Sequence, residues 1–209
     1  MRPDQLRSTY DSVAEAYAER FVDELTRKPF DRQLLDRIAV EAPAPRGMDV
    51  GCGPGHVGRY LQERGLDVTG VDLSPGMIAV AQRLNPALRF EVADMRALPV
   101  PDGRLGAVVA FYSLIHVPRE EVPGVLREFA RALMPAGRLL IAVHRGSGTI
   151  RRGEFLGRPV PFDAELFEPE QLLEMVEAQA FERVTVTVRA AYDFELPTER
   201  LYLSATRSA

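Results

Sequence analysis

Three glycines at alternate positions, between an apolar segment and a helical one, constrain this chain more than any other feature. They are Gly51, Gly53 and Gly55, within the segment Met48–Gly58. Glycine tolerates the backbone angles of a sharp turn, and its missing side chain lets a ligand approach the main chain. The amides at the start of the next helix can then face an electron-rich group. The pattern predicts a loop at the end of the first strand of an α/β sheet, where a nucleotide or a nucleoside binds.

The composition narrows the class of protein. A length of 209 residues suits a single domain, 1–209, and a hydrophobic content of 46% is enough for a sizeable core. The net charge of −4 argues against a nucleic-acid partner, which usually leaves a basic footprint. The single cysteine, Cys52, excludes an intramolecular disulfide, and the three scattered histidines predict no metal site.

The N-terminus lacks the apolar core of a signal peptide, and no apolar run is long enough to cross a bilayer. We therefore expect a cytoplasmic protein without a membrane partner.

Short β-like runs alternate with amphipathic helical ones, which is typical of a largely parallel sheet covered on both faces. The expected strands are 47–50, 66–71, 88–92, 105–111 and 137–143, and the expected helices between and after them are 56–64, 77–84, 119–133 and 169–180. Two earlier helices, 8–25 and one opening at Pro29, make an N-terminal helical cap over residues 1–42.

The last two β-like runs, 181–192 and 201–206, leave little room for a crossover helix between them. They predict an antiparallel pair at the sheet edge, and so a mostly parallel seven-stranded α/β sheet with helices on both faces and a C-terminal antiparallel β-pair. Residues 145–168 show no regular pattern, and a connection of that length is usually functional or mobile.

The glycine loop by itself fits two kinds of ligand. Gly53, Gly55 and Gly58 satisfy G-x-G-x-x-G, which suits a dinucleotide pyrophosphate. Asp49, immediately before the first glycine, favours a nucleoside without phosphates. A carboxylate there repels a diphosphate but can bind an ammonium group directly or through water. The terminal β-pair also departs from the usual dinucleotide-binding arrangement.

The run Asp49-Val50-Gly51-Cys52-Gly53-Pro54-Gly55 resembles, almost residue for residue, the first motif of the class I S-adenosylmethionine-dependent methyltransferases of the small-molecule type. The resemblance covers roughly residues 8–207 and is strongest over 47–143. It implies a Rossmann-like fold and transfer of a methyl group from S-adenosyl-L-methionine to a small organic acceptor, with S-adenosyl-L-homocysteine as the product.

Three alternatives stay open at this point. One is an NAD(P)-dependent oxidoreductase. The others keep S-adenosylmethionine but are non-catalytic, or catalyse a reaction other than methyl transfer, such as cyclisation.

Acidic residues at two further strand ends fit the cofactor. Asp72 ends the second strand, where its carboxylate can accept both ribose hydroxyls. Its alternative role as a helix-preceding turn residue is already filled by Ser74, the predicted N-cap. The resemblance places Asp94 near the adenine amino group and the backbone of Met95 near the ring. The full set of expected cofactor contacts is Tyr10, Tyr17, Asp49, Gly51, Cys52, Gly53, Gly55, Asp72, Leu73, Met77, Asp94, Met95 and Phe111.

The first helix carries Tyr10 and Tyr17, which lie two turns apart and share one face. It resembles the family's N-terminal tyrosine helix, which lies over the bound cofactor, so one of these tyrosines should reach the cofactor carboxylate or the acceptor. The alternative is a core stripe with Val13, Ala14 and Phe21.

Ligands of open α/β sheets collect beyond the carboxyl ends of the strands, which places the segment after strand four beside cofactor and acceptor. His116 in that segment is the candidate base or acceptor contact, because an imidazole titrates near physiological pH. Its alternative is a histidine packed against the sheet end. Tyr112 and His144 are further candidates for contact with the acceptor.

Two positions depart from the family pattern: Ala136 replaces a usual glycine, and Gly106 stands where strand four commonly has an aspartate. The 145–168 connection, which varies on the substrate side of such enzymes, carries apolar residues that line a pocket or form a minor core of their own. We expect a small-molecule acceptor as the partner, and a monomer or a homodimer.

Overall fold

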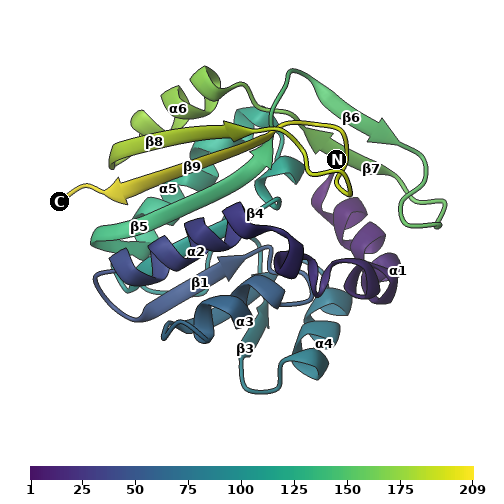
Figure 1. The fold of residues 1–209 in the computed structure, drawn as a ribbon, viewed down its shortest axis with the longest axis horizontal. Coiled ribbons are helices and arrows are strands. Elements are labelled where there is room, and N and C mark those ends of the chain that lie inside the picture. Colours follow the sequence, from purple (N-terminus) through teal and green to yellow (C-terminus); the bar gives the residue numbers. More distant parts are fainter.

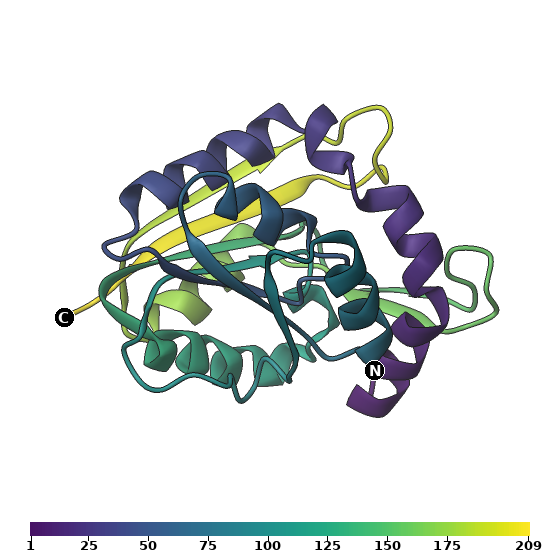
Figure 2. The same ribbon diagram turned by 90° about the horizontal axis from the view of Figure 1, so that it is seen from below.

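The computed structural model describes all residues 1–209. A seven-stranded sheet runs through its centre with helices on both faces (Figures 1 and 2). The strand order is β3-β2-β1-β4-β5-β9-β8. The strands are β1 (Arg46–Val50), β2 (Asp67–Asp72), β3 (Arg89–Val92), β4 (Leu105–Phe111), β5 (Leu133–His144), β8 (Phe181–Arg189) and β9 (Arg200–Arg207).

Strands β1 to β5 pair in parallel, whereas β9 is antiparallel to both β5 and β8. This confirms the predicted Rossmann-like sheet with a C-terminal antiparallel pair. The helices are α1 (Pro3–Phe21), η1 (Glu24–Arg27), α2 (Pro29–Glu41), α3 (His56–Gln62), α4 (Pro75–Leu84), η2 (Leu114–His116), η3 (Arg119–Glu121), α5 (Val122–Ala132) and α6 (Pro169–Glu177).

The central strand β4 is apolar on both faces, so each face of the sheet packs against its own apolar layer. Val108 and Ala110 point into the larger core cluster, with α5 and α6. Ala107 and Val109 point into the other cluster, with α2, α3 and α4. Figure 2 shows α2 and α5 on opposite sides of the sheet. Helix α1 packs on α4 at the edge of this layer.

The prediction that 145–168 lacks regular structure was wrong. Strands β6 (Thr149–Arg152) and β7 (Phe162–Glu165) pair as an antiparallel two-stranded sheet. Each is only four residues long, and nine residues separate them, so no hairpin signal stands out in the sequence. In Figures 1 and 2 this β6–β7 hairpin lies beside α1, above the strand ends.

Helix boundaries near the N-terminus also differ from the prediction. Helix α1 starts five residues earlier than expected, at Pro3, and ends at Phe21, after which the separate η1 turn begins. Helix α4 begins as predicted, since Ser74 Oγ accepts a hydrogen bond from Met77 N–H and Pro75 occupies the first turn. None of the helices has both the length and the apolar character needed to span a bilayer.

Gly106, one of the two departures from the family pattern, has a steric cause. The segment before β1 passes directly over Gly106, so that an added Cβ would overlap Ala44 O and lie 2.9 Å from Ala44 C. No aspartate fits there.

Candidate active site

A pocket opens at the carboxyl ends of β1, β2 and β4, and residues of α1 form part of its lining. This is the edge where parallel sheets bind ligands. It brings together residues that are far apart in the sequence. The expected site residues in its lining are Tyr10, Tyr17, Gly51, Gly53, Asp72, Leu73, Asp94, Met95, Phe111, Tyr112 and His116.

The three loop glycines serve different purposes. All have positive φ, between 50° and 80°. A Cβ on Gly51 would lie 2.8 Å from Ser113 Oγ, and one on Gly55 would lie 2.6 Å from the Phe90 ring, so both glycines are required by packing. A Cβ on Gly53 would meet only Tyr17 Cε1, at 3.6 Å. Gly53 is therefore the glycine that leaves room for a ligand beside the main chain.

Asp72 stands at the centre of the pocket wall. Gly53 N–H donates to its Oδ2 and Ser74 N–H donates to its Oδ1, both at 2.9 Å. Burial raises the pKa of Asp72, although these two backbone donors oppose that shift. Each carboxylate oxygen has a further lone pair, so the side chain is held in place and can still accept two hydroxyl donors.

Asp94 and Met95 follow β3 and line one end of the pocket, together with Arg96. Arg96 Nη1 lies 3.1 Å from both carboxylate oxygens of Asp94, and Arg96 Nε donates to Glu121 at 2.7 Å. Arg96 is not among the site residues expected from the sequence. A basic residue two positions after an acidic one in a loop is common, and nothing in the sequence marks this one.

Four of the expected cofactor residues lie outside the pocket lining. Asp49 is buried under the loop, where its Oδ2 accepts from Gly58 N–H at 2.9 Å. It caps the first turn of α3, whose own N-cap, Gly55, has no side chain to do so. Burial raises the pKa of Asp49 to about 7. In the structure Asp49 supports the loop, and its expected contact with the cofactor stays a prediction.

Cys52, Gly55 and Met77 also support the site from behind. Cys52 is buried against Gly70, and burial raises the pKa of its thiol. Met77 is completely buried among the small side chains Ala14 and Ala18, under α1. Side chains in these places shape the walls without facing the pocket.

His116 lines the same pocket from the η2 turn that follows β4. Its Nε2 is 2.6 Å from the hydroxyl of Tyr10, and its Nδ1 is 2.8 Å from the backbone carbonyl of Asp163 on β7. The imidazole is 9% exposed, and burial lowers its pKa to about 4. His116 is therefore a neutral imidazole near pH 7.

An aromatic cover joins α1 to the β6–β7 hairpin. The Phe155 ring lies 5.8 Å from that of Tyr10 and stacks on Phe162 at 4.5 Å. Thr9 Oγ1 donates to the carbonyl of Pro161 at 3.0 Å. Phe155 thus packs against α1, whereas Phe162 and Phe167 belong to the larger core cluster, so the 145–168 connection forms no separate minor core. The other expectation, that these apolar residues line the pocket, does not hold, because the lining contains Tyr10 and Tyr17 of α1 and no residue of 145–168.

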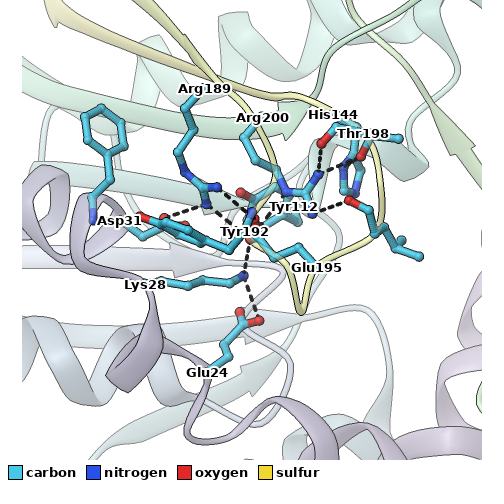
Figure 3. A network of polar contacts seen from close by, with 12 residues as sticks. Glu24, Lys28, Asp31, Tyr112, His144, Arg189, Tyr192, Glu195, Thr198 and Arg200 are labelled. Atoms are coloured by element: carbon cyan, nitrogen blue, oxygen red, sulfur yellow. Dashed lines mark hydrogen bonds and ion pairs between the residues drawn. The ribbon is translucent and has the colours of Figure 1, made fainter.

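A buried network of charges lies beyond the ends of β4, β5 and β9 (Figure 3). Glu195, in the β8–β9 loop, has a side chain only 3% exposed. Its carboxylate lies 2.7 Å from Arg189, 3.3 Å from Lys28 and 3.5 Å from Arg200. Burial acts to raise the pKa of Glu195. The hydrogen bond from Arg189 and the charges of Lys28 and Arg200 outweigh it and lower that pKa to about 2. The network ties the β8–β9 loop to the start of α2.

Tyr112 connects this network to the pocket. Its ring lies 5.2 Å from Lys28 Nζ and 5.3 Å from the His144 ring, and its hydroxyl is 3.1 Å from that of Tyr202. Its backbone is left-handed, with a φ of 53°, an uncommon and strained conformation for a bulky residue. His144 itself does not line the pocket. Its Nδ1 lies 2.9 Å from Thr198 Oγ1 and its ring packs against Tyr112, so its expected contact with the acceptor stays a prediction.

The pocket also extends along α1 further than the sequence analysis assigned. Pro3, Leu6 and Arg7 line it together with Tyr10. Their spacing continues the tyrosine face of α1 by two turns toward the N-terminus. That periodicity was the available signal, and an expected helix start at residue 8 concealed it.

Comparisons with known proteins agree with this geometry. Residues 48–137 match a family model described as a methyltransferase domain. A demethylmenaquinone methyltransferase from Renibacterium salmoninarum is 31% identical over 166 residues, which cover 77% of this chain and 69% of that protein. A trans-aconitate 2-methyltransferase from Methylobacterium nodulans is 38% identical over 130 residues, covering 58% of this chain and 46% of that protein.

Solved structures share the fold at lower identity. A SAM-dependent methyltransferase from Methanosarcina mazei has a TM-score of 0.73 at 17% identity, covering 82% of this chain and 97% of its own. Magnesium protoporphyrin IX methyltransferase from Synechocystis with bound SAH has a TM-score of 0.72 at 20% identity, covering 99% of both chains.

The fold, the loop and these relatives define the class of protein. The chain belongs to the class I S-adenosylmethionine-dependent methyltransferases. Its cofactor is S-adenosylmethionine and its product S-adenosylhomocysteine. The predicted family and cofactor are confirmed, and nothing in the comparisons supports an oxidoreductase.

Proposed function

We propose that the pocket holds S-adenosylmethionine with its ribose on Asp72, its adenine beside Asp94 and Met95, and its methionine part along Gly51 and Gly53. Asp72 carries this proposal, because two backbone donors orient its carboxylate toward the pocket and leave lone pairs for a diol. Gly53 supports it with open space beside the main chain.

This orientation determines where the acceptor binds. With the adenine at the end of β3, the reactive methyl group points toward the end of β4, where Phe111, Tyr112 and His116 line the pocket. Tyr10 covers the same end from α1. A small organic acceptor between these side chains lies in line with the methyl group and the sulfur.

Methyl transfer depends mainly on the alignment of the acceptor with the methyl group. When bound, the cofactor supplies an electrophilic methyl group, and the chain excludes water and holds the acceptor for in-line attack. Holding two reactants in such a geometry contributes about 7–11 kcal/mol toward lowering a barrier. The α1 cover and the β6–β7 hairpin are the elements that exclude water here.

The acceptors printed in the relatives' names differ from one another: a menaquinone precursor, a malonyl group on its carrier protein, and trans-aconitate. We therefore propose a small-molecule acceptor without taking its identity from any relative. One neighbour of the same fold, with a TM-score of 0.67 and 21% identity, is named a [4+2]-cyclase, so the test must detect methyl transfer itself.

The test measures S-adenosylhomocysteine binding by calorimetry in wild type, Asp72→Ala and Asp72→Asn. We expect Asp72→Ala to bind S-adenosylhomocysteine at least about tenfold more weakly, because it loses hydrogen bonds to a charged group. The matched control is Asp67→Ala, at the exposed start of the same strand, where the side chain pairs with Arg89. Unchanged affinity in Asp72→Ala would reject the ribose role.

A second measurement separates the functional classes. We expect S-adenosylhomocysteine to accumulate when wild-type protein, S-adenosylmethionine and a panel of small acceptors are mixed. Binding without its release would favour a non-catalytic protein or a reaction other than methyl transfer. A cytoplasmic location, a monomeric or homodimeric state and the lack of a nucleic-acid partner stay predictions, the last supported by the net charge of −4.

A further inference from the structure

The hydrogen bond between Tyr10 and His116 has a determined direction. The Asp163 carbonyl can only accept, so His116 Nδ1, 2.8 Å away, must carry a hydrogen. In a neutral imidazole the other nitrogen is then a bare acceptor. Tyr10 Oη, 2.6 Å from Nε2, must therefore donate to it.

This direction leaves Tyr10 with accepting capacity that faces the pocket. A phenolic oxygen that donates its one hydrogen keeps lone pairs for an incoming donor. Tyr10 and His116 both line the pocket, and the structure shows no other hydrogen-bond partner for the Tyr10 hydroxyl. The imidazole lies behind, held on its far side by β7.

We propose that Tyr10 is a catalytic residue that accepts the proton of a hydroxyl acceptor, and that His116 is a positioning residue that acts through Tyr10 by taking its proton. The assignment rests on the proposed function above. It replaces direct contact between His116 and the acceptor, because Tyr10 occupies the imidazole nitrogen that would make that contact.

The step balances. The acceptor oxygen forms a bond to the methyl group as the bond from that methyl to sulfur breaks and its electron pair stays on sulfur. The acceptor's proton passes to Tyr10 Oη, and Tyr10's own proton passes to His116 Nε2. Methyl transfer removes one positive charge from the pocket and protonation of His116 adds one, so the pocket keeps its net charge. That conservation matters because His116 is too deeply buried to become charged at little cost.

The surrounding walls indicate the class of acceptor. The Tyr10 ring lies 5.8 Å from the rings of both Tyr17 and Phe155, and Phe111 and Tyr112 line the same pocket. Three charged groups bear on this part of the pocket. Asp72 acts on Tyr10, and the Met1 ammonium group, which also lines the pocket, acts on His116 and lies 3.9 Å from Asp163 Oδ2. Asp72 is assigned to the ribose and Asp163 balances the Met1 charge, while Arg7, on the turn of α1 before Tyr10, is exposed to solvent, so none of them is left to pair with a charged acceptor. A flat, uncharged aromatic body with a hydroxyl group fits these walls, which makes a phenol the expected acceptor class and O-methylation the reaction.

The test uses phenols of increasing acidity: phenol, 4-chlorophenol and 4-nitrophenol. Without the Tyr10 hydroxyl, only a phenol that is already ionised can attack. Tyr10→Phe should lower kcat about 100-fold or more for phenol itself, and the deficit should shrink toward wild type for 4-nitrophenol. His116→Gln should show the same trend. Tyr60→Phe is the control, since the Tyr60 hydroxyl, on α3, donates to exposed Asp36 on α2 and does not line the pocket.

Two further measurements need no turnover. Nitrogen NMR of the free protein should show His116 with a protonated Nδ1 and an accepting Nε2, and Tyr10→Phe should shift only the Nε2 signal. Calorimetry should give S-adenosylhomocysteine affinities of Tyr10→Phe and His116→Gln within about twofold of wild type, because neither side chain is assigned to the cofactor in this proposal.

The outcomes are distinct. An equal loss of kcat across the three phenols in Tyr10→Phe would overturn the proton route. Wild-type methylation of amines or thiols but of no phenol would overturn the acceptor class while leaving the proposed function standing. Failure of wild type to bind S-adenosylhomocysteine would instead reject the proposed function.

Discussion

At the scale of single residues, backbone conformation explains where this chain follows its family and where it departs. Gly51 and Gly55 are required by the packing of Ser113 and Phe90, so no other residue fits at these two loop positions. Ala136, in the turn within β5, adopts a φ of 65°, where the family usually has glycine. For an L-residue with a Cβ this left-handed conformation is unfavourable by roughly 1–2 kcal/mol.

Ala136→Gly should therefore stabilise the protein. Glycine relieves the left-handed strain but adds some conformational entropy to the unfolded chain, so we expect a net gain of about 0.5–1 kcal/mol. Urea denaturation measures it. Ala87→Gly, in an exposed loop, is the control and should gain nothing. Destabilisation by Ala136→Gly would contradict the strain.

Asp49 makes a pH-dependent contribution of its own. Burial raises its pKa to about 7, against about 3.9 in the unfolded chain. Its contribution to stability is therefore present below pH 4 and is lost as the pH rises through 7. Asp49→Asn keeps an oxygen for Gly58 N–H and removes the ionisation. The stability of this variant relative to wild type should rise between pH 5 and pH 8, measured by thermal melts; a constant difference would count against the raised pKa.

At the scale of elements, the site is held together by contacts between segments that lie far apart in the sequence and share no sequence pattern. Thr9 and Tyr10 of α1 reach the β6–β7 hairpin, and Glu195 of the β8–β9 loop reaches Lys28 at the start of α2. The second contact supports Tyr112, since Lys28 lies against the Tyr112 ring. The proposed acceptor site thus depends on segments near both ends of the chain.

Glu195→Gln tests the second contact. Neutralising Glu195 leaves Arg200 without its carboxylate partner, whereas Lys28 keeps Glu24 and Arg189 keeps Asp31. Removing one partner from a buried ion pair costs about 3–5 kcal/mol, and the partners that stay set the loss toward the lower end. Glu199→Gln is the matched control in the same loop, because Glu199 pairs with Arg145 at half-exposed positions where such pairs contribute less than about 1 kcal/mol. Urea denaturation compares them, and equal effects would show that the network adds nothing.

At the scale of the whole molecule, the two neutral histidines beyond the strand ends make stability depend on pH. Burial is the first cause at both, and it lowers the pKa of His116 to about 4 and that of His144 to about 3. The unfolded chain takes up these protons near pH 6.5, while the native protein does not until the pH falls to about 4. Their stabilising contribution is present above pH 6.5 and is lost below it.

The free energy of unfolding should therefore fall as the pH drops from 6.5 to 4. Each unit of pKa difference corresponds to about 1.4 kcal/mol, and the two histidines together outweigh the opposite contribution of Asp49. His144→Gln should make the decline shallower, as measured by urea denaturation at a series of pH values. A stability that is level across this window would show that the histidines titrate normally.

The order of strands and helices, the glycine loop and the two acidic strand ends could all be read from the sequence. Periodicity, turn residues and the Ser74 cap act over a few neighbouring positions, so they leave a local signal. The resemblance of the glycine loop to the first motif of the family predicted the cofactor. For the same reason the parallel sheet and its antiparallel edge were predicted correctly, with boundaries within a few residues.

What only the tertiary structure decided lies between segments distant in sequence. Tyr10 and His116 are 106 positions apart, and Asp31 and Tyr202 are 171 apart. The crossing of Ala44 over Gly106, and the capping of α3 by Asp49, depend likewise on how strands and connections meet. Such contacts arise because packing brings together side chains that no local rule relates. The sequence therefore determined the fold and the methyl donor, and the packing of α1, the hairpin and the β8–β9 loop decided what surrounds the acceptor.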